Sequence, residues 1–161
     1  MTPRPFVERY AGELPPGRAL DLACGTGANA MWLADRGWQV TGVDWNADSL
    51  AQLRAAAPQV ETHLADLEAH RFDIGEQHWD LIVVSHYLQR DLFPKILRGL
   101  KPNGRAIIIV HMFEPGHETS RFSVHPGELR QLFEGARIVA YEEGNPTGRA
   151  TARIAVEPGI H

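Results

Sequence analysis

The chain has 161 residues, of which 43% are hydrophobic and 22% charged, and this is about the length of one typical domain. Its formal net charge is -4 and its basic residues are scattered, whereas a surface that binds a nucleic-acid duplex needs a basic stripe. Cys24 is the only cysteine, which excludes an intramolecular disulfide framework, and no apolar run approaches the roughly 20 residues that span a bilayer. We therefore expect one domain over residues 1–161, soluble and cytoplasmic, with neither a nucleic acid nor a membrane as its partner.

Short aliphatic runs alternate with helical patterns along the chain, which is typical of a parallel sheet covered by helices. The run at 80–85 is almost continuously apolar, as in a central parallel strand that is buried on both faces. The last two runs are joined by turn residues at 145–148, which indicates an antiparallel hairpin. The sequence thus predicts an α/β fold with helices on both faces of a seven-stranded, mostly parallel sheet, whose strands cover residues 19–23, 38–43, 60–64, 80–85, 105–111, 136–141 and 149–156.

Helices are expected before and between these strands. The first lies within residues 1–16 and carries Phe6 and Tyr10 one turn apart. This pair makes the helix a candidate lid over a ligand, or it is simply packed against the sheet. The further helices are expected at about 28–36, between the cap Asn46 or Asp48 and the stop Pro58, at about 92–100 with Asp91 as its cap, and between Pro126 and Gly135.

A glycine-rich turn follows the first expected strand and opens the helix at 28–36. The segment 25–30 (GTGANA) has the G-x-G-x-x-G/A spacing that lets a ligand approach the backbone, and Asp44 lies 19 residues beyond Gly25 at the end of the second strand. A carboxylate at that place can accept hydrogen bonds from ribose hydroxyls. The alternative is a turn needed only for chain reversal, with Asp44 starting another turn. Taken alone, the pattern fits NAD as well.

Asp21 helps to distinguish between the possible cofactors, because it lies inside the first strand four positions before Gly25. A dinucleotide would place its anionic pyrophosphate at the following helix N-terminus, where two unit charges 4 Å apart repel by about 4 kcal/mol at an effective dielectric constant of 20. A ligand with an ammonium and a sulfonium would instead be attracted, which favours S-adenosylmethionine. Alternatively, or in addition, the carboxylate is hydrogen-bonded to loop amides.

Five segments together resemble the class I S-adenosylmethionine-dependent methyltransferases. They are 20–27 (LDLACGTG), Val43-Asp44, Ala65-Asp66-Leu67, 79–82 (WDLI) and 100–105 (LKPNGR). The resemblance implies the single-domain, Rossmann-like fold of this family. It also implies S-adenosylmethionine as cofactor, with S-adenosylhomocysteine as product.

The resemblance further implies roles for individual residues around that cofactor. The expected cofactor-binding residues are Asp21 near the methionyl amino group, Gly25 and Gly27 with Ala23 against the methionyl moiety, Asp44 on the ribose hydroxyls, Trp45 beside the adenine, Asp66 on the adenine amino group, the backbone amide of Leu67 on a ring nitrogen, and Ser85 on the reaction side.

The acceptor is expected to be a small molecule, because one short domain leaves no room for a substrate module. Where several nitrogen methyltransferases carry an Asn/Asp-Pro-Pro-aromatic motif, this chain has Ser85-His86-Tyr87-Leu88, and its segment 121–129 resembles the tellurite-resistance and thiopurine-type enzymes. The loop at 112–124 would form one wall of the acceptor site. The candidate residues are His86 and His111 as bases for a neutral hydroxyl acceptor, Arg90, His111 and Arg121 to hold an oxyanion, and Tyr87 as a further substrate contact.

Other interpretations stay open at this stage. Each arginine can be a solvated charge, His86 can be packed at a strand end, and Cys24 is expected to be a small filler without a partner base. The histidine spacing matches no metal motif, so no metal site is expected. The chain could also be a cofactor-binding domain without turnover, or an NAD-linked oxidoreductase. The sequence indicates neither the acceptor atom nor the oligomeric state.

Overall fold

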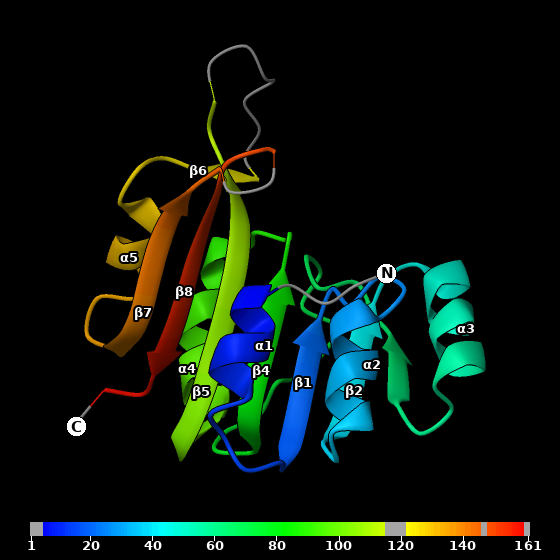
Figure 1. Ribbon diagram of the computed structural model, residues 1–161. Helices are drawn as coiled ribbons and strands as arrows, with labels where there is room; N and C mark the ends of the chain where they lie inside the picture. The colour runs from blue at the N-terminus through cyan, green and yellow to red at the C-terminus, as the bar shows by residue number, and fades with distance from the viewer. Residues whose placement is uncertain (1–4, 115–121, 146–147, 160–161) are drawn as a thin grey trace.

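The computed structural model describes residues 5–114, 122–145 and 148–159. They form one eight-stranded sheet with helices on both faces (Figure 1). The strand order is β3-β2-β1-β4-β5-β8-β7, and β6 pairs with β5 off this path. The strands are β1 (Arg18–Leu22), β2 (Gln39–Asp44), β3 (Glu61–Leu64), β4 (Trp79–Ser85), β5 (Leu100–Met112), β6 (Ser123–Val124), β7 (Arg137–Gly144) and β8 (Thr151–Glu157).

The strands from β1 to β5 are parallel, while β8 runs antiparallel between β5 and β7. This confirms the expected α/β fold, and all seven predicted strands are present. The two-residue strand β6 is an addition, because Ser123 and Val124 pair in parallel with His111 and Met112. It falls at the end of the segment expected to be a loop, of which residues 115–121 lie outside the described part of the chain.

Within the described part of the chain, five α-helices cover the two faces of the sheet (Figure 1). One apolar cluster joins the first three helices to one face, and a second cluster joins the last two helices to the other face. The central strand β4 supplies both clusters in alternation, with Leu81 and Val83 on one side and Ile82 and Val84 on the other, as expected for a strand buried on both faces. The helices are α1 (Pro5–Ala11), α2 (Ala28–Asp35), α3 (Ala47–Ala56), α4 (Phe93–Gly99) and α5 (Glu128–Leu132).

Of the expected helix caps Asn46 and Asp91, the structure confirms the first and contradicts the second. Asn46 caps α3, because its side-chain oxygen accepts a hydrogen bond of 3.0 Å from the Ser49 amide. The prediction that Asp91 caps the fourth helix is wrong, since Asp91 lies within a 3-10 turn, η1 (Arg90–Leu92), and α4 begins only after Leu92. The Asp91 carboxylate instead lies 3.2 Å from Nε2 of His70.

Helix α1 is fastened to the sheet at its C-terminal end. Arg105 on β5 donates one hydrogen bond of 2.8 Å to the carbonyl of Tyr10 and another of 2.7 Å to the carboxylate of Glu13. Phe6 and Tyr10 are buried with ring centroids 4.6 Å apart, so the pair is packed against the sheet. Among the described residues, no helix is both long enough and apolar enough to cross a membrane.

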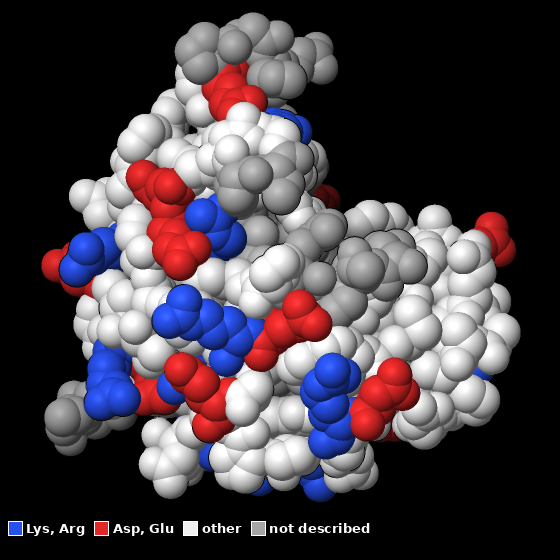
Figure 2. Space-filling view, viewed as in Figure 1, with Lys and Arg blue, Asp and Glu red and all other residues white. Residues whose placement is uncertain are grey.

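Acidic and basic side chains are interspersed over the face of the molecule seen in Figure 2. Among the described residues on that face, no basic stripe gathers over one element. The charges there are those of an ordinary solvated surface.

Candidate functional site

The chain reverses sharply where β1 and β4 end, at the edge of the sheet formed by the carboxyl ends of the parallel strands. Ala23, just after β1, and His86, just after β4, both have left-handed backbones, with φ angles of 57° and 60°. Such a conformation costs a residue other than glycine about 1–2 kcal/mol. Ligands of open α/β sheets bind at this edge, so the strain lies where a site is expected.

The glycine turn between β1 and α2 needs its two glycines for different reasons. Gly25 has a φ of 57°, and a Cβ at this position would meet no atom within 4 Å, so the backbone faces open space. Gly27 has a φ of 89°, and its Cβ would lie 2.3 Å from a methyl carbon of Leu53 on α3. Gly25 therefore leaves room for a ligand, whereas Gly27 permits close packing of α2 against α3.

Asp44 connects the end of β2 to this turn. One of its carboxylate oxygens accepts a hydrogen bond of 2.8 Å from the Gly25 amide, and the other accepts one of 2.9 Å from the Asn46 amide. The residue is buried. Because each carboxylate oxygen can accept two hydrogen bonds, these contacts leave capacity for ribose hydroxyls as well.

Asp21 lies beneath the turn and is only 2% exposed. It accepts a hydrogen bond from the Ala30 backbone, while its Oδ2 atom has no hydrogen-bond partner within the described part of the chain. Burial, with the nearby charge of Asp44, raises the pKa of Asp21 from 3.8 to about 7. A buried carboxylate with an unsatisfied oxygen is costly without a partner, and a cationic ligand group would provide one.

The surroundings of Cys24 favour its protonated thiol. Burial raises the pKa of its thiol far above the usual range, and the charges of Asp21 and Asp44 raise it further. The thiolate is therefore suppressed. The sulfur instead packs beside Gly42, whose Cβ position would be 3.1 Å from it.

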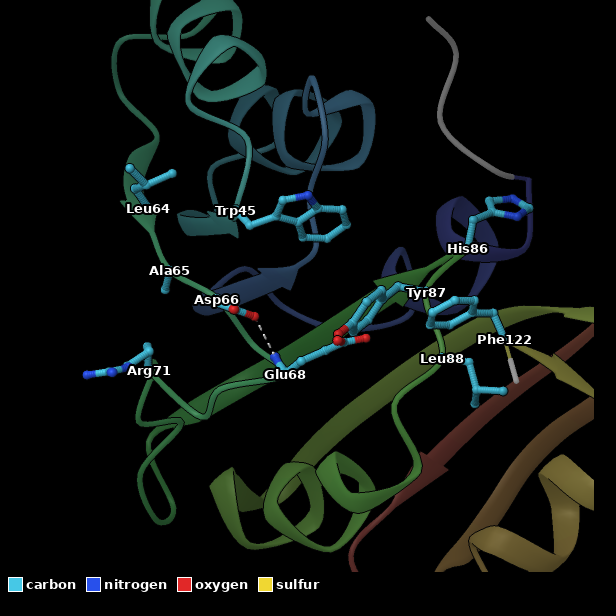
Figure 3. A pocket seen from close by; sticks show the side chains of 10 residues that line it. All are labelled: Trp45, Leu64, Ala65, Asp66, Glu68, Arg71, His86, Tyr87, Leu88 and Phe122. Atoms are coloured by element: carbon cyan, nitrogen blue, oxygen red, sulfur yellow. Dashed lines mark hydrogen bonds between the residues drawn. The ribbon is translucent and has the colours of Figure 1, made fainter. Parts of the chain in front are cut away.

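A cavity of about 910 Å³ opens beside these residues (Figure 3). Trp45 after β2 and Tyr87 after β4 lie next to each other on its wall, with ring centroids 5.8 Å apart. Trp45 is 56% exposed, which is unusual for so large a ring and leaves one face for a planar ligand. The cavity is lined by Trp45, Leu64, Ala65, Asp66, Glu68, Arg71, His86, Tyr87, Leu88 and Phe122.

Asp66 and Leu67 follow β3 at the rim of this cavity. The Asp66 carboxylate is exposed and accepts hydrogen bonds from the amides of Glu68 and Ala69, at 3.0 and 3.3 Å. The side chain of Leu67 is buried in the core, so only its backbone can contact a ligand. The adenine contacts that the resemblance implies for these two residues stay a prediction.

His86 and His111 form a pair at the ends of β4 and β5. Nδ1 of His86 lies 3.2 Å from Nε2 of His111, and the ring centroids are 4.6 Å apart. The structure thus brings together the two histidines that the sequence singled out. Ser85 is the last residue of β4 and pairs with Ile109.

The remaining sequence candidates lie in different places. Arg90 donates a hydrogen bond of 2.7 Å from Nε to the carboxylate of Glu128, which lowers the pKa of that carboxyl group, and it also contacts the Ser123 carbonyl. Its guanidinium therefore fastens η1 to α5 and β6. Tyr87 lies on the same cavity as Trp45, and Arg121 falls outside the described residues.

Sequence reasoning missed several residues that line the cavity. Leu64 is the last residue of β3, and Leu88 lies three residues after β4, each close to predicted residues. The rule that ligands bind beyond the strand ends could have found them. Phe122 comes from a segment without periodicity, and no local signal points to it. Within the described ranges, no group of three or more His, Cys, Asp or Glu residues could hold a metal ion.

One segment of the chain has known relatives. It contains the glycine turn, the carboxylates of Asp21 and Asp44 and most of the residues that line the adjoining cavity. Residues 19–104 match the family described as "Methyltransferase domain". The chain belongs to this family. Its cofactor is accordingly S-adenosylmethionine, and the cationic groups of that molecule fit the unsatisfied oxygen of Asp21.

Two curated relatives of this methyltransferase domain illustrate the range of the family. A trans-aconitate 2-methyltransferase from Azoarcus sp. (strain BH72) is 35% identical over 133 residues, covering 75% of this chain and 49% of that protein. A probable S-adenosyl-L-methionine-dependent methyltransferase TehB from Haemophilus influenzae is 27% identical over 144 residues, covering 81% of this chain and 49% of that protein. The chain thus spans about half the length of these relatives.

A solved structure shows the same fold. The crystal structure of TehB from Haemophilus influenzae superposes with a TM-score of 0.81 at 23% identity, covering 97% of this chain and 62% of that chain. The Rossmann-like methyltransferase fold expected from the sequence is thereby confirmed.

Proposed function

We propose that this domain transfers a methyl group from S-adenosylmethionine to a small-molecule acceptor in the cytoplasm. The observation that carries the proposal is the buried oxygen of Asp21, which has no hydrogen-bond partner among the described residues and lies beside the left-handed glycine turn. An anionic dinucleotide would be repelled there, whereas an ammonium or sulfonium group would be attracted. The names of the relatives from Azoarcus and Haemophilus support a methyltransferase, and the first of them names a small organic acid as its substrate.

Each part of the cofactor has a suitable set of residues. Asp21 and the backbone of the turn at Gly25 would hold the methionyl end, and Asp44 would hold the ribose while keeping its hydrogen bond to Gly25. Trp45, with Tyr87 packed against it, would lie beside the adenine, with Asp66 and the Leu67 backbone at its polar edge.

The protein's work in this reaction is mostly geometric. S-adenosylmethionine supplies a methyl group on a positively charged sulfur, and the acceptor's electron pair forms the new bond as the carbon–sulfur bond breaks. Holding the reacting atoms at about 3–3.5 Å in a site without water can supply roughly 7–11 kcal/mol of the barrier. A neutral hydroxyl acceptor would also lose a proton, which the imidazole of His86 could accept and share with His111 across their 3.2 Å contact.

A thermal-shift comparison of S-adenosylhomocysteine with NADH tests the cofactor assignment. We expect S-adenosylhomocysteine to raise the melting temperature and NADH to leave it unchanged. Preferential stabilisation by NADH would establish the oxidoreductase alternative, and no response to either ligand would indicate a degenerate fold.

Methyl transfer itself needs a second measurement. Labelled S-adenosylmethionine is incubated with small thiols, selenite or tellurite, phenols, amines and carboxylates, and the label in each product is counted. Binding of S-adenosylhomocysteine without transfer to any of these classes would overturn the catalytic part of the proposal and leave a binding domain.

A further inference from the structure

A second cavity, of about 530 Å³, lies at the same edge of the sheet, between α1, the end of β5 and the β7–β8 hairpin. Its volume is in the range of about 300–1,000 Å³ that small-molecule sites occupy. His86 lines both this cavity and the one lined by Trp45 and Tyr87. The lining residues that carry the argument are Phe6, Tyr10 and Ile109 on the apolar side and Arg9, Arg149 and Arg153 on the charged side.

The charged side has an excess of positive charge. Three arginines line the cavity, and Glu142 is the one acidic residue among its described lining residues. Arg153 is held in place, because Nη1 donates a hydrogen bond of 2.6 Å to the Thr151 hydroxyl and Nε lies 3.3 Å from the Glu142 carboxylate. Its side chain is only 12% exposed, so its charge faces less water than an ordinary surface arginine.

Arg149 and Arg9 extend the positive wall. Arg149 is exposed and makes one long contact, 3.3 Å from Nη2 to the Ser123 hydroxyl. The guanidinium of Arg9 lies 5.2 Å from the centre of the Tyr10 ring. A guanidinium binds carboxylates with two parallel hydrogen bonds, so this wall is suited to an anionic group.

The apolar side makes the cavity unlike a site for a bare inorganic anion. Phe6 and Tyr10 pack ring against ring, and Ile109 on β5 continues the apolar wall. Phe6, Tyr10 and Ile109 are only 7%, 8% and 2% exposed. An inorganic oxyanion would fill little of a cavity of 530 Å³, whereas a ligand with a hydrocarbon body would fill more of it and cover what remains exposed of these side chains.

We infer that this cavity is the methyl-acceptor site and that it takes a small organic carboxylate. The hydrocarbon body contacts Phe6 and Tyr10, the carboxylate contacts Arg149 and Arg153, and the nucleophilic atom faces the cofactor past His86. This inference rests on the proposed function only in calling the bound molecule a methyl acceptor. The preference of the cavity for organic anions is argued from its lining residues alone.

The test is an NMR titration of the full chain with benzoate, succinate and citrate, with benzamide as the uncharged match of benzoate and inorganic phosphate as the match in charge. Each titration is run with and without S-adenosylhomocysteine at constant ionic strength. We expect at least one carboxylate to shift the amides of Thr151 and Arg153, and to leave the amide of Asp66 unchanged. Benzamide and phosphate are expected to shift none of them.

Two variants and a matched control then locate the anion. Arg153→Gln is expected to weaken carboxylate binding by about tenfold or more, as hydrogen bonds to charged groups contribute about 1.5–3 kcal/mol. Arg149→Gln is expected to weaken it several-fold and, because its residue is exposed, to fold normally. Arg54→Gln on α3, another exposed arginine, is expected to change nothing.

The outcomes separate this inference from the proposed function. No shift with any carboxylate, shifts of equal size with phosphate, or full binding by Arg149→Gln would each overturn the assignment of the cavity to an organic anion. Failure of S-adenosylhomocysteine to bind, with the carboxylate shifts intact, would instead overturn the proposed function and leave an organic-anion site.

Discussion

At the scale of single residues, the most unusual group is the carboxyl of Asp21. It lies within a strand, is 2% exposed, and has an oxygen without a partner in the described residues. The nearby Asp44 adds a second negative charge, and its own two oxygens already hold the turn. The two carboxyl groups therefore form an anionic region, and the free-energy cost of burying them is offset when a cation binds beside them.

Replacing Asp21 by Asn is expected to stabilise the free protein at pH 8 and to weaken its cofactor binding. The folded pKa of about 7 lies above the ordinary value of 3.8, so the stability that Asp21 contributes when protonated is present at low pH and is lost as the pH rises through 7. Asp21→Asn should thus raise the melting temperature by several degrees at pH 8 and by less at pH 6.

Calorimetry on the same variant supplies the second half of this prediction. Binding of S-adenosylhomocysteine should weaken at least tenfold, about 1.4 kcal/mol, because the carboxylate no longer attracts the ammonium. A lower melting temperature at pH 8 would show that the ionised carboxylate is already satisfied in the free protein.

The same carboxyl predicts a proton released on binding. Near pH 7 about half of the Asp21 groups carry a proton, and a cationic ligand group favours the ionised form. The affinity for S-adenosylhomocysteine should therefore fall from pH 8 to pH 6. Titration calorimetry at pH 7 in two buffers of different ionisation enthalpy should register proton release, and Asp21→Asn should abolish it. Equal heats in both buffers for the unaltered chain would contradict the prediction.

Asp44→Ala is expected to weaken S-adenosylhomocysteine at least tenfold, about 1.4 kcal/mol. The substitution removes the ribose acceptor and also leaves the Gly25 and Asn46 amides without their partner. Asp44→Asn is the matched control, since it keeps one acceptor oxygen, and should lose less affinity. An unchanged dissociation constant for the alanine variant, measured by calorimetry, would be incompatible with the ribose assignment.

At the scale of elements, the turn, α2 and α3 behave as one packed unit. Asn46, two residues after Asp44, caps the N-terminus of α3. Leu53 on the same helix packs on Gly27 of the turn. The position of the turn thus depends on a helix that follows the next strand. Its geometry is held by packing as well as by hydrogen bonds.

Gly27→Ala tests this packing. Its Cβ would lie 2.3 Å from Leu53 and its φ is 89°, so strain and overpacking together should lower the free energy of unfolding by about 2–4 kcal/mol. Gly25→Ala is the matched comparison, because its φ is also positive but its Cβ meets nothing within 4 Å. It should lose only about 1–2 kcal/mol in urea denaturation. Equal losses in the two variants would show that the contact with Leu53 relaxes freely.

The elements that could be predicted from sequence are those with local signals. Aliphatic runs identified the seven longer strands, and Asn46 identified the start of α3. Strand β6 could not be predicted, because two residues carry no periodicity and their pairing partners lie on β5. The assignment of Asp91 as a cap failed because a short 3-10 turn precedes α4.

The residues of the candidate site likewise divide into those that local sequence signals predict and those that only the fold brings together. Asp21, Gly25, Gly27 and Asp44 belong to one strand–turn–helix unit and the strand beside it, so spacing alone was enough to bring them together. The arginines of the second cavity come from α1, from β8 and from the turn just before β8, at opposite ends of the chain. Only the fold brings Arg9 near Arg153, and the sequence instead drew attention to Arg90, which is occupied by Glu128.

At the scale of the whole molecule, the two cavities divide the upper edge of the sheet between them. One follows the ends of β2, β3 and β4, and the other follows β5 and the antiparallel pair β7 and β8. His86, after the central strand β4, belongs to both. In the proposed function, the parallel strands would thus serve the cofactor, and the antiparallel pair would give the acceptor a charged wall of its own.

The left-handed backbone of His86 makes the residue at this position informative when related sequences are compared. Glycine would relieve a strain of about 1–2 kcal/mol here, so stability alone drives the position toward glycine. A benefit from the imidazole would oppose that drift. A copy that carries glycine after β4 would therefore have gained backbone stability and lost the one side chain that lines both cavities among the described residues.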